Sequence, residues 1–536
     1  MPALLTYPGV YVEEISSGVR SITGVATSIT AFLGRALKGP TEPTLINSFS
    51  DFHRIFGGLW ALSPLGYAVN DFYLNGGGQA IIVRLYHPND DHDKKTKAII
   101  AVNCSQESQS LQLEAANEGS WANSLKVRIT YPNEAVAKET IKSQGLDKYS
   151  ITETDLFNLT IRNIETGETE TFQNLTVKDS PRRVTEVLKN ESKLLRTTSD
   201  LPNEIPAKHA DAPDKNKSIW DENNPETSIG VVDASKAFDG DDLDASDYTK
   251  DSAGMDLLNK VDIFNLLCIP LEASFSEKNY VAIYQKAMKL CADRRAMLIV
   301  DPPNGFSADK LGDLGLTGPA ARNAAFYFPR IVKEDPLRGR QQRIFAPSGA
   351  IAGVIARTDS QRGVWKAPAG VDAAISGITG LEVNLNDAEN GSLNPLGINC
   401  LRSFPVYGSI VWGARTLRGS DQLGDEYKYI PVRRMALYIE ESLFRGLKWV
   451  VFEPNNESLW AQIRLNVGAF MHNLFRQGAF QGTTPQKAYF VKCDKETTTQ
   501  DDINKGIVNV IVGFAPLKPA EFVVIKIQQM AGDIQV

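Results

Sequence analysis

The stretch Ile263-Phe264-Asn265-Leu266-Leu267-Cys268-Ile269, closed by Pro270, determines the fold class of the centre of this chain. It is an apolar run of strand length, and a second such run, Ala296 to Val300, ends at Asp301-Pro302-Pro303. Between the two runs, apolar residues recur at helical spacing: Tyr280, Ile283, Tyr284, Ala287, Met288 and Cys291. A strand, a helix and a second strand in this order predict a crossover unit, and therefore a parallel sheet covered by helices.

The neighbouring segments extend this α/β pattern in both directions. Upstream, residues 22–90 predict two strands and two helices, and downstream Ala325 to Phe328 predicts a strand and Ser348 opens a helix. The glycine run Asn75-Gly76-Gly77-Gly78 follows a helix and opens a strand, whereas a phosphate-binding loop follows a strand and opens a helix. We therefore interpret it as a turn. The upstream elements are Ile29–Leu33, Phe49–Phe56, residues 64–74 and Ala80–Tyr86.

The last part of the chain has the strongest pattern and predicts an α+β domain. Asn456 is placed to cap an amphipathic helix that ends near Phe475. Its apolar stripe consists of Leu459, Trp460, Ile463, Val467, Phe470, Met471 and Leu474. The other expected elements are a helix over Val432–Leu447 and strands over Trp449–Phe452, Ala488–Lys492 and Ile507–Phe514.

Residues 91–226 differ from both flanks because they are polar, charged and rich in strands, which predicts a variable outer insertion. Phe157–Arg162 and Thr171–Leu175 flank Glu165-Thr166-Gly167, which is the signature of a hairpin. Ser180 and Pro181 are expected to provide the N-cap and first residue of a helix through Leu188. Residues 197–226 are expected to form an exposed loop.

Both ends of the chain carry a strand-like segment with no partner nearby in the sequence. These are Val10 to Ile15 and Glu521 to Ile527. Val523, Ile525 and Ile527 share one face of the second segment, while Phe522 and Val524 share the other. A terminal strand that is apolar on both faces must be covered and paired, either in its own domain or by another copy of the chain.

Composition limits the classes of function. The 536 residues include 42% hydrophobic and 23% charged residues, which is typical of a globular protein with several domains. A net charge of -7 argues against nucleic-acid binding, and no apolar stretch is long enough for a membrane span or a signal peptide. The five cysteines are scattered without a C-x-x-C pair, so neither disulfides nor a zinc site are expected.

Several of these segments, taken in order, resemble the contractile tail sheath family of bacteriophages, R-type bacteriocins and phage-tail-like injection systems. The resemblance covers both ends and the central α/β part, and it is weakest across residues 125–226. It rests on Tyr7-Pro8-Gly9-Val10-Tyr11-Val12-Glu13-Glu14, Gly119-Ser120-Trp121-Ala122-Asn123, Phe238-Asp239-Gly240, Arg433-Arg434, Trp449-Val450-Val451-Phe452-Glu453-Pro454-Asn455, Gly478-Ala479-Phe480-Gln481-Gly482 and Pro519-Ala520-Glu521-Phe522-Val523.

The resemblance implies a multidomain α/β and α+β architecture with extended strand arms at both ends. Its central domain, residues 227–400, would be subtilisin-like in fold but without a catalytic triad. The expected parts are an N-terminal arm (1–21), an N-terminal part of the core (22–90), a β-rich outer insertion (91–226), the central domain (227–400), a C-terminal assembly domain (401–515) and a C-terminal arm (516–536).

The function implied by the resemblance is mechanical. The chain would polymerise as stacked rings in a helical tube around an inner tube protein, and the tube would contract without a nucleotide or any other cofactor. Baseplate and tail-cap proteins, and sheath paralogues, would be the other partners. The chain would be made in the bacterial cytoplasm and become part of a virion tail or of an extracellular or cell-associated particle. A baseplate structural protein and a hydrolase on an α/β scaffold remain the alternatives.

The residues expected to carry this function belong to the two arms. Those expected to exchange strands between subunits are Val10, Tyr11, Val12, Glu13, Ile15, Phe522, Val523, Val524, Ile525 and Ile527.

Two arginines outside the arms are a further candidate contact. Arg433 and Arg434 are placed either to contact the inner tube or a neighbour, or to form a salt bridge inside their own domain.

Candidate catalytic and metal-binding residues are few. None of the five histidines lies between residues 227 and 400, so a Ser-His-Asp triad confined to that domain is excluded, and Ser348 lacks the G-x-S-x-G context of a nucleophile. A triad that recruits a histidine from elsewhere in the chain remains as an alternative. The carboxylates Asp239, Asp241, Asp242, Asp244 and Asp247 miss the spacing of a calcium loop, and Asp90-Asp91-His92-Asp93 lies beside Lys94 and Lys95. Both clusters are interpreted as solvated loops rather than metal sites.

Overall fold

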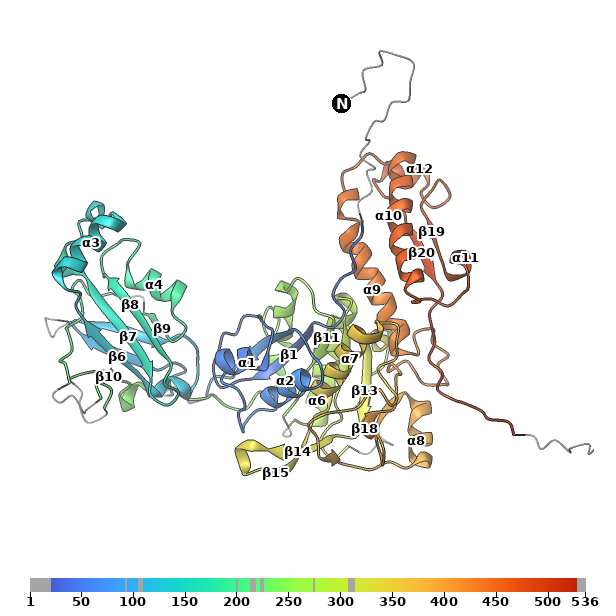
Figure 1. The fold of residues 1–536 in the computed structure, drawn as a ribbon, viewed down its shortest axis with the longest axis horizontal. Coiled ribbons are helices and arrows are strands. Elements are labelled where there is room, and N and C mark those ends of the chain that lie inside the picture. Colours follow the sequence, from blue (N-terminus) through green and yellow to red (C-terminus); the bar gives the residue numbers. More distant parts are fainter. Residues whose placement is uncertain are drawn as a thin grey trace, which may run out of the picture. The chain divides into compact units, whose positions relative to one another are not determined.

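The computed structural model describes residues 21–91, 94–104, 109–198, 201–212, 218–221, 226–272, 275–306 and 314–527. Two compact units are present (Figure 1). The first comprises the described parts of Met1–Phe32, Ala68–Ile81 and Val261–Val536, and the second comprises those of Leu33–Tyr67 and Ile82–Lys260. No helix in these described ranges is long and apolar enough to cross a membrane.

The predicted parallel sheet is present and forms the centre of the fold. Its parallel ladder joins β1 (Thr30–Arg35), β11 (Leu266–Cys268), β12 (Met297–Val300), β13 (Ala324–Phe328) and β17 (Ile398–Phe404), and β18 (Gly408–Val411) adds an antiparallel edge. The full strand order is β18-β17-β13-β12-β11-β1-β3-β2, where β2 is Thr44–Ile46 and β3 is Ala80–Leu85. The central strands β11, β12 and β13 read as continuous apolar runs, and all their residues are buried because helices and loops cover both faces of the sheet there.

Helices of the first unit include α6 (Glu277–Asp293), α7 (Ser348–Arg362), α8 (Asp387–Leu393) and the part of α2 (Leu65–Leu74) from Ala68 onward. Helix α6 buries every residue of the predicted apolar stripe. Helix α7 approaches α2 closely at two glycines, because a Cβ on Gly349 would lie 2.1 Å from the carbonyl oxygen of Ala68 and one on Gly353 would lie 2.5 Å from that of Phe72. A separate antiparallel sheet is formed by β14 (Ile331–Asp335), β15 (Gln341–Phe345) and β16 (Gly380–Leu381).

The C-terminal part is α+β, as predicted. Helix α9 (Ile430–Gly446) and helix α10 (Glu457–Arg476) are followed by the short helices α11 (Pro485–Ala488) and α12 (Gln500–Asn504), and β19 (Tyr489–Lys492) pairs with β20 (Ile511–Phe514). The side chain of Asn456 accepts a hydrogen bond from the Leu459 amide, so the predicted cap is confirmed, and the apolar stripe of α10 is buried.

The predicted strand Trp449–Phe452 is wrong. Residues Lys448–Val450 form a 3-10 turn, and Phe452 is fully exposed with a left-handed φ of 71°. The β-branched and aromatic residues there favour a strand, but that preference depends on a neighbouring strand to pair with. The chain instead uses this segment to reverse direction between α9 and α10 (Figure 1).

The second unit contains α1 (Phe49–Phe56), as predicted, and two antiparallel sheets with a common apolar core. One sheet is β4 (Ile99–Asn103), β5 (Ser110–Ala115) and β9 (Leu195–Thr197), and the other is β10 (Ile229–Gly230), β6 (Leu125–Thr130), β7 (Phe157–Asn163) and β8 (Thr169–Leu175). The hairpin predicted from Glu165-Thr166-Gly167 is confirmed as β7–β8. Besides α1, the second unit contains the helices α3 (Glu134–Gln144), α4 (Val184–Glu191) and α5 (Ala245–Thr249).

The predicted start of helix α4 is wrong. The helix begins at Val184, and its N-cap residue Arg183 makes no side-chain cap. The Ser180 side chain accepts a hydrogen bond from the Arg182 amide, and its carbonyl accepts one from the Arg183 amide. Ser180 and Pro181 therefore form a tight turn just before the helix, which uses the same residue types as a helix start.

Candidate functional site: the C-terminal arm and its attachment

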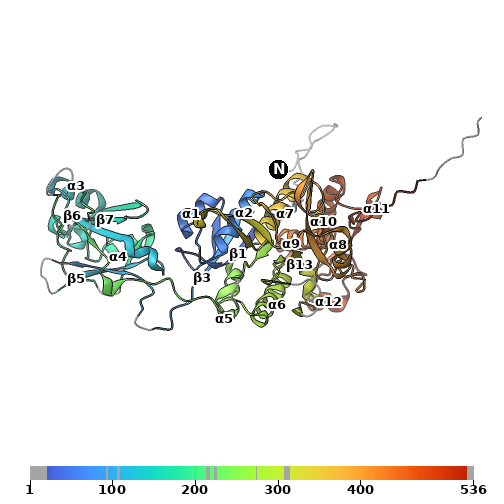
Figure 2. The ribbon, with the colours of Figure 1, turned by 90° about the horizontal axis from the view of Figure 1, so that it is seen from below.

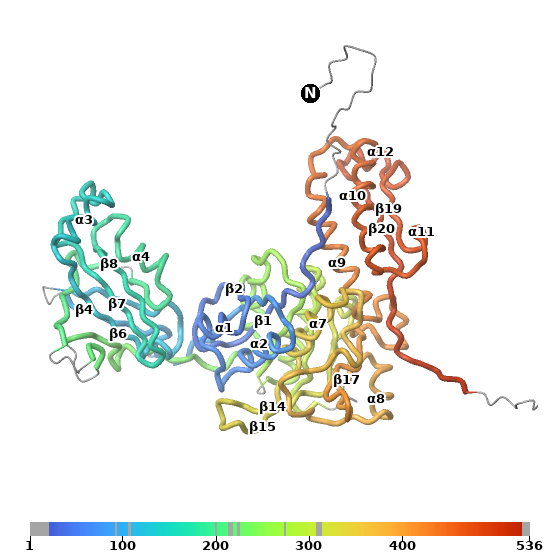
Figure 3. Tube along the Cα trace, in the orientation of Figure 1, coloured from blue at the N-terminus to red at the C-terminus, as the bar shows by residue number. Residues whose placement is uncertain are grey.

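The described part of the C-terminal arm, residues 516–527, exposes a continuous run of large apolar side chains. Phe522, Val523, Val524, Ile525 and Ile527 have exposed fractions between 75% and 91%. Within the described residues, the backbone of 517–527 belongs to no strand and makes no hydrogen bond. The arm leaves the first unit and runs away from it (Figures 2 and 3). The apolar side chains predicted from the sequence are therefore not covered by any other residue that the structure describes.

The base of the arm is attached to the first unit at two points. A β-bridge joins Pro516 to Phe480. Five residues later, the carboxylate of Glu521 receives two hydrogen bonds from the guanidinium of Arg415, at 2.8 and 2.6 Å, and one from the hydroxyl of Tyr429 at 3.1 Å. Burial opposes the charge of Arg415, but the hydrogen bonds and charge of Glu521 outweigh it and raise the pKa of Arg415.

A cavity of about 990 Å³ lies in the first unit beside the base of the arm. Residues Leu517 to Phe522 line it together with Trp365, Arg402 and Trp412. The arm backbone that borders this cavity has unpaired amide and carbonyl groups, so the space is bordered by aromatic side chains and by an extended chain edge.

The sheet β19–β20 is a second surface with unpaired strand edges. It consists of two strands only, in antiparallel register from Tyr489 opposite Phe514 to Lys492 opposite Ile511. Each strand therefore has one edge without a strand partner in the described part of the chain. Phe490 and Ile511 are exposed on this sheet. Such an edge is a template for pairing with another strand.

The N-terminal residues expected to exchange strands, Val10, Tyr11, Val12, Glu13 and Ile15, lie outside the described residues.

Arg433 and Arg434 are buried and paired within the chain. Arg434 forms a bidentate ion pair with Asp359, at 2.7 and 2.5 Å, and also donates to the Thr27 carbonyl. Arg433 donates to the side chains of Asn323 and Glu440, both at 3.1 Å. The geometry is that of the internal salt bridge, the alternative left open by the sequence, and we do not propose these two residues as a contact with an inner tube.

Ser348 is not placed as a nucleophile. Its side chain is buried at the start of α7 and makes no hydrogen bond, while its amide donates to Asp301 at 2.7 Å. Three of the four described histidines contact other groups: His87 contacts Asp247, His209 accepts from the Ile129 amide, and His472 contacts the Tyr489 hydroxyl. Burial raises the pKa of Asp301 to about 6, although the hydrogen bond from the Ser348 amide and the charge of Arg330 oppose this shift.

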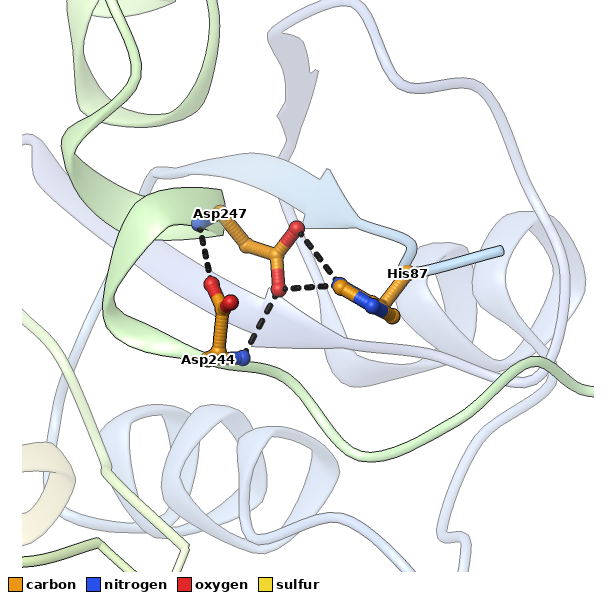
Figure 4. Close-up of side chains that lie close together, drawn as sticks. All are labelled: His87, Asp244 and Asp247. Atoms are coloured by element: carbon orange, nitrogen blue, oxygen red, sulfur yellow. Dashed lines mark hydrogen bonds and ion pairs between the residues drawn. The ribbon is translucent and has the colours of Figure 1, made fainter. Parts of the chain in front are cut away.

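Three potential metal ligands do converge in the second unit: His87, Asp244 and Asp247 (Figure 4). Asp244 caps α5 by accepting from the Asp247 amide, and Asp247 accepts in return from the Asp244 amide. His87 Nδ1 lies 2.9 Å from the same Asp247 carboxylate. Asp244 and Asp247 thus form a capping box, and His87 is in hydrogen-bond contact with Asp247, which accounts for why the three side chains lie close together.

Sequence reasoning missed the partners of Glu521. Glu521 stands out as a charged residue that opens an apolar terminal segment, and that signal is visible in the sequence. Nothing in the sequence selects Arg415 from the other 56 basic residues of the chain, because the two residues are 106 positions apart.

Comparisons with known proteins agree with this architecture. Residues 243–417 match the phage tail sheath protein central domain and residues 423–530 match the phage tail sheath C-terminal domain, which together cover more than half of the chain. The tail sheath protein of Vibrio phage KVP40 is 27% identical over 175 residues, which are 32% of this chain and 24% of that protein. This match therefore spans less than two thirds of the relative's length.

Solved structures resemble nearly the whole chain. The helical sheath of the anti-feeding prophage in its contracted state gives a TM-score of 0.56 at 22% identity and covers 98% of this chain and 100% of that one. A sheath tail protein from Listeria innocua gives a TM-score of 0.59 at 12% identity, with 92% of this chain and 96% of that one covered. The mixed α/β multidomain fold is thus similar to that of sheath proteins, and with both of its family domains matched in order, the chain belongs to the phage tail sheath protein family.

Proposed function

We propose that this chain is a structural subunit that polymerises into a helical sheath around an inner tube. The sheath contracts and drives the tube through a target envelope. The observation that carries the proposal is the C-terminal arm, whose apolar side chains are exposed and whose backbone is unpaired in the described chain. An exposed apolar strand promotes aggregation of a monomer, whereas in a polymer it can connect one subunit to the next.

The arms connect subunits by strand exchange. Phe522, Val523, Val524, Ile525 and Ile527 pair with a neighbouring copy, and the open edges of β19 and β20 are the receiving sheet. Fully burying one large apolar side chain is worth about 1.5–3 kcal/mol, so five such side chains provide a substantial gain for each contact. The N-terminal residues Val10, Tyr11, Val12, Glu13 and Ile15 form the second connection.

Family membership supports the remaining parts of the proposal. Residues 227–400 form a subtilisin-like domain that serves as a rigid scaffold, flanked by the core part 22–90 and the outer insertion 91–226. Residues 401–515 form the assembly domain between the arms 1–21 and 516–536. The partners are further copies of the chain, an inner tube protein, and baseplate and tail-cap proteins, in a particle made in the bacterial cytoplasm. No catalytic step and no cofactor are part of the proposal.

A truncation tests the proposal directly. Removing residues 522–536 leaves Glu521 in place, and we expect a folded protein that no longer forms long tubes under conditions where the full chain does. Electron microscopy of negatively stained protein measures tube formation, and circular dichroism checks the fold.

A point variant with a matched control sharpens this test. Val523→Lys places a charge in the arm, whereas Val406→Lys places the same charge at an equally exposed valine in the β17–β18 turn (83% and 84% exposed). Only the first variant is expected to reduce tube formation. Normal tubes from the truncated chain would refute strand exchange through this arm.

A further inference from the structure

We propose that Arg415, Tyr429 and Glu521 form a clamp that fixes where the C-terminal arm leaves its own subunit. Glu521 is then a positioning residue for assembly, and the exchangeable segment begins at Phe522. This inference rests on the proposed strand exchange, although the clamp itself can be measured on the monomer.

The first step of the argument is the geometry around Arg415. Its side chain is completely buried, and all three guanidinium nitrogens donate hydrogen bonds. Nε and Nη2 hold the two oxygens of Glu521, while Nη1 donates to the carbonyls of Asn394 and Gly419 and to Asp421. A bidentate pair between a planar guanidinium and a carboxylate fixes both distance and orientation.

The second step is that Arg415 belongs to the rigid part of the fold. Asn399, in the core strand β17, accepts from the Arg415 amide at 2.6 Å and donates to its carbonyl at 2.7 Å. A β-bridge also joins Arg415 to Tyr429, the second donor to Glu521. The two donors therefore stay in place whether or not the arm is bound, and the arm is the partner that is held.

The third step is that the arm has no other polar attachment. Among the described residues 517–527, only Glu521 makes a hydrogen bond or an ion pair. Before it, the nearest attachment is the bridge at Pro516. Without the clamp the arm would pivot about Pro516, and its free length would grow by the five residues from Leu517 to Glu521.

The functional consequence concerns effective concentration. A strand that leaves its subunit at a fixed point and in a fixed direction reaches a neighbour's sheet at a smaller entropic cost than one on a longer free linker. The clamp also transmits force, since tension on the exchanged strand reaches Arg415 and the core sheet through Glu521. Its loss is expected to weaken assembly without changing the strand that is exchanged.

Glu521→Gln tests the clamp because it preserves shape while removing the charge that Arg415 binds. Glu426→Gln, at an exposed carboxylate outside the clamp, removes the same charge as a control. A nitroxide on Val523→Cys reports arm motion, and all five native cysteines are buried, so the label has one accessible thiol. In dilute monomer we expect a restricted spectrum for the labelled chain and for its Glu426→Gln variant, and a faster one for Glu521→Gln.

Assembly of unlabelled protein provides the second readout. We expect the concentration needed for tube formation to rise at least tenfold for Glu521→Gln, to stay unchanged for Glu426→Gln, and to be intermediate for Glu521→Asp, which keeps the charge on a shorter side chain. Equal label mobility in Glu521→Gln and its parent would overturn the clamp. A clear difference in mobility, with no tubes from the full chain under any condition, would support the clamp and count against the sheath function instead.

Discussion

The buried ion pair between Arg434 and Asp359 gives the sharpest prediction about the stability of the first unit. Both side chains are 4% exposed, and Arg434 also donates a hydrogen bond to the Thr27 carbonyl. Asp359→Asn removes one charge and leaves the other buried without a full partner, which typically costs about 3–5 kcal/mol. With urea m-values of about 1–3 kcal/mol per molar, the unfolding midpoint of this unit should fall by at least about 1 M.

The assay is urea unfolding of monomeric protein, followed by tryptophan fluorescence, with a matched control. Asp501→Asn breaks the pair with Lys505, in which both side chains are more than 60% exposed, and should cost no more than about 1 kcal/mol. Replacing both partners, Arg434→Met with Asp359→Leu, should recover much of the loss, because an apolar pair needs no compensation.

The result that would refute this reasoning is equally specific. If Asp359→Asn leaves the midpoint unchanged but prevents the sheath from docking on an inner tube, the pair is a binding element and its burial in the monomer is incidental. A loss of stability with normal docking at low denaturant would support the structural role.

Three further perturbations have defined outcomes. Burial raises the pKa of Asp301 from 3.8 to about 6. Protonated Asp301 therefore contributes about 3 kcal/mol to the free energy of unfolding below pH 3.8, and this contribution is lost as the pH rises through 6. Asp301→Asn should flatten the pH dependence of the unfolding midpoint between these two pH values. The Cβ of Gly349→Ala would clash with the Ala68 carbonyl, so this variant should lower the free energy of unfolding by about 1–3 kcal/mol, as measured by thermal melting. Phe470→Ala, on the buried face of α10, should lower the free energy of unfolding by about 3–5 kcal/mol in the same assay.

Elements with a strong local signal could be predicted from the sequence. Helix α1 has the predicted bounds, α10 has the predicted cap and buried stripe, and the strand–helix–strand unit around α6 forms the parallel sheet. These succeed because capping and apolar spacing act between residues a few positions apart. The predictions for Trp449–Phe452 and Ser180-Pro181 were wrong because the residue types there fit two structures equally well. Contacts with the surrounding chain decide which of the two forms.

The same difference between local and long-range signals applies to the candidate site. The apolar faces of the arm are a local pattern, so its proposed role as a connector could be predicted from Phe522 to Ile527 alone. Its attachment is not local, since Arg415 and Tyr429 lie about a hundred positions upstream and only the folded sheet brings them to Glu521. The burial of Arg433 and Arg434 could not be predicted for a related reason. Two arginines near a helix start give the same sequence pattern whether they lie on the surface or in the core.

A contracting sheath of the proposed kind needs subunits that keep their shape while their contacts change. The buried pairs Arg434–Asp359 and Lys333–Asp71 tie distant segments of the first unit to each other, so they favour motion as one body. The arm beyond Glu521 has the opposite character, because nothing in the described chain restrains it. We therefore expect contraction to leave the internal pairs intact and to bend the chain where the clamp meets the exchanged strand, at the junction of Glu521 and Phe522. Because only that short link must deform, the connection between subunits can persist while the bodies rotate.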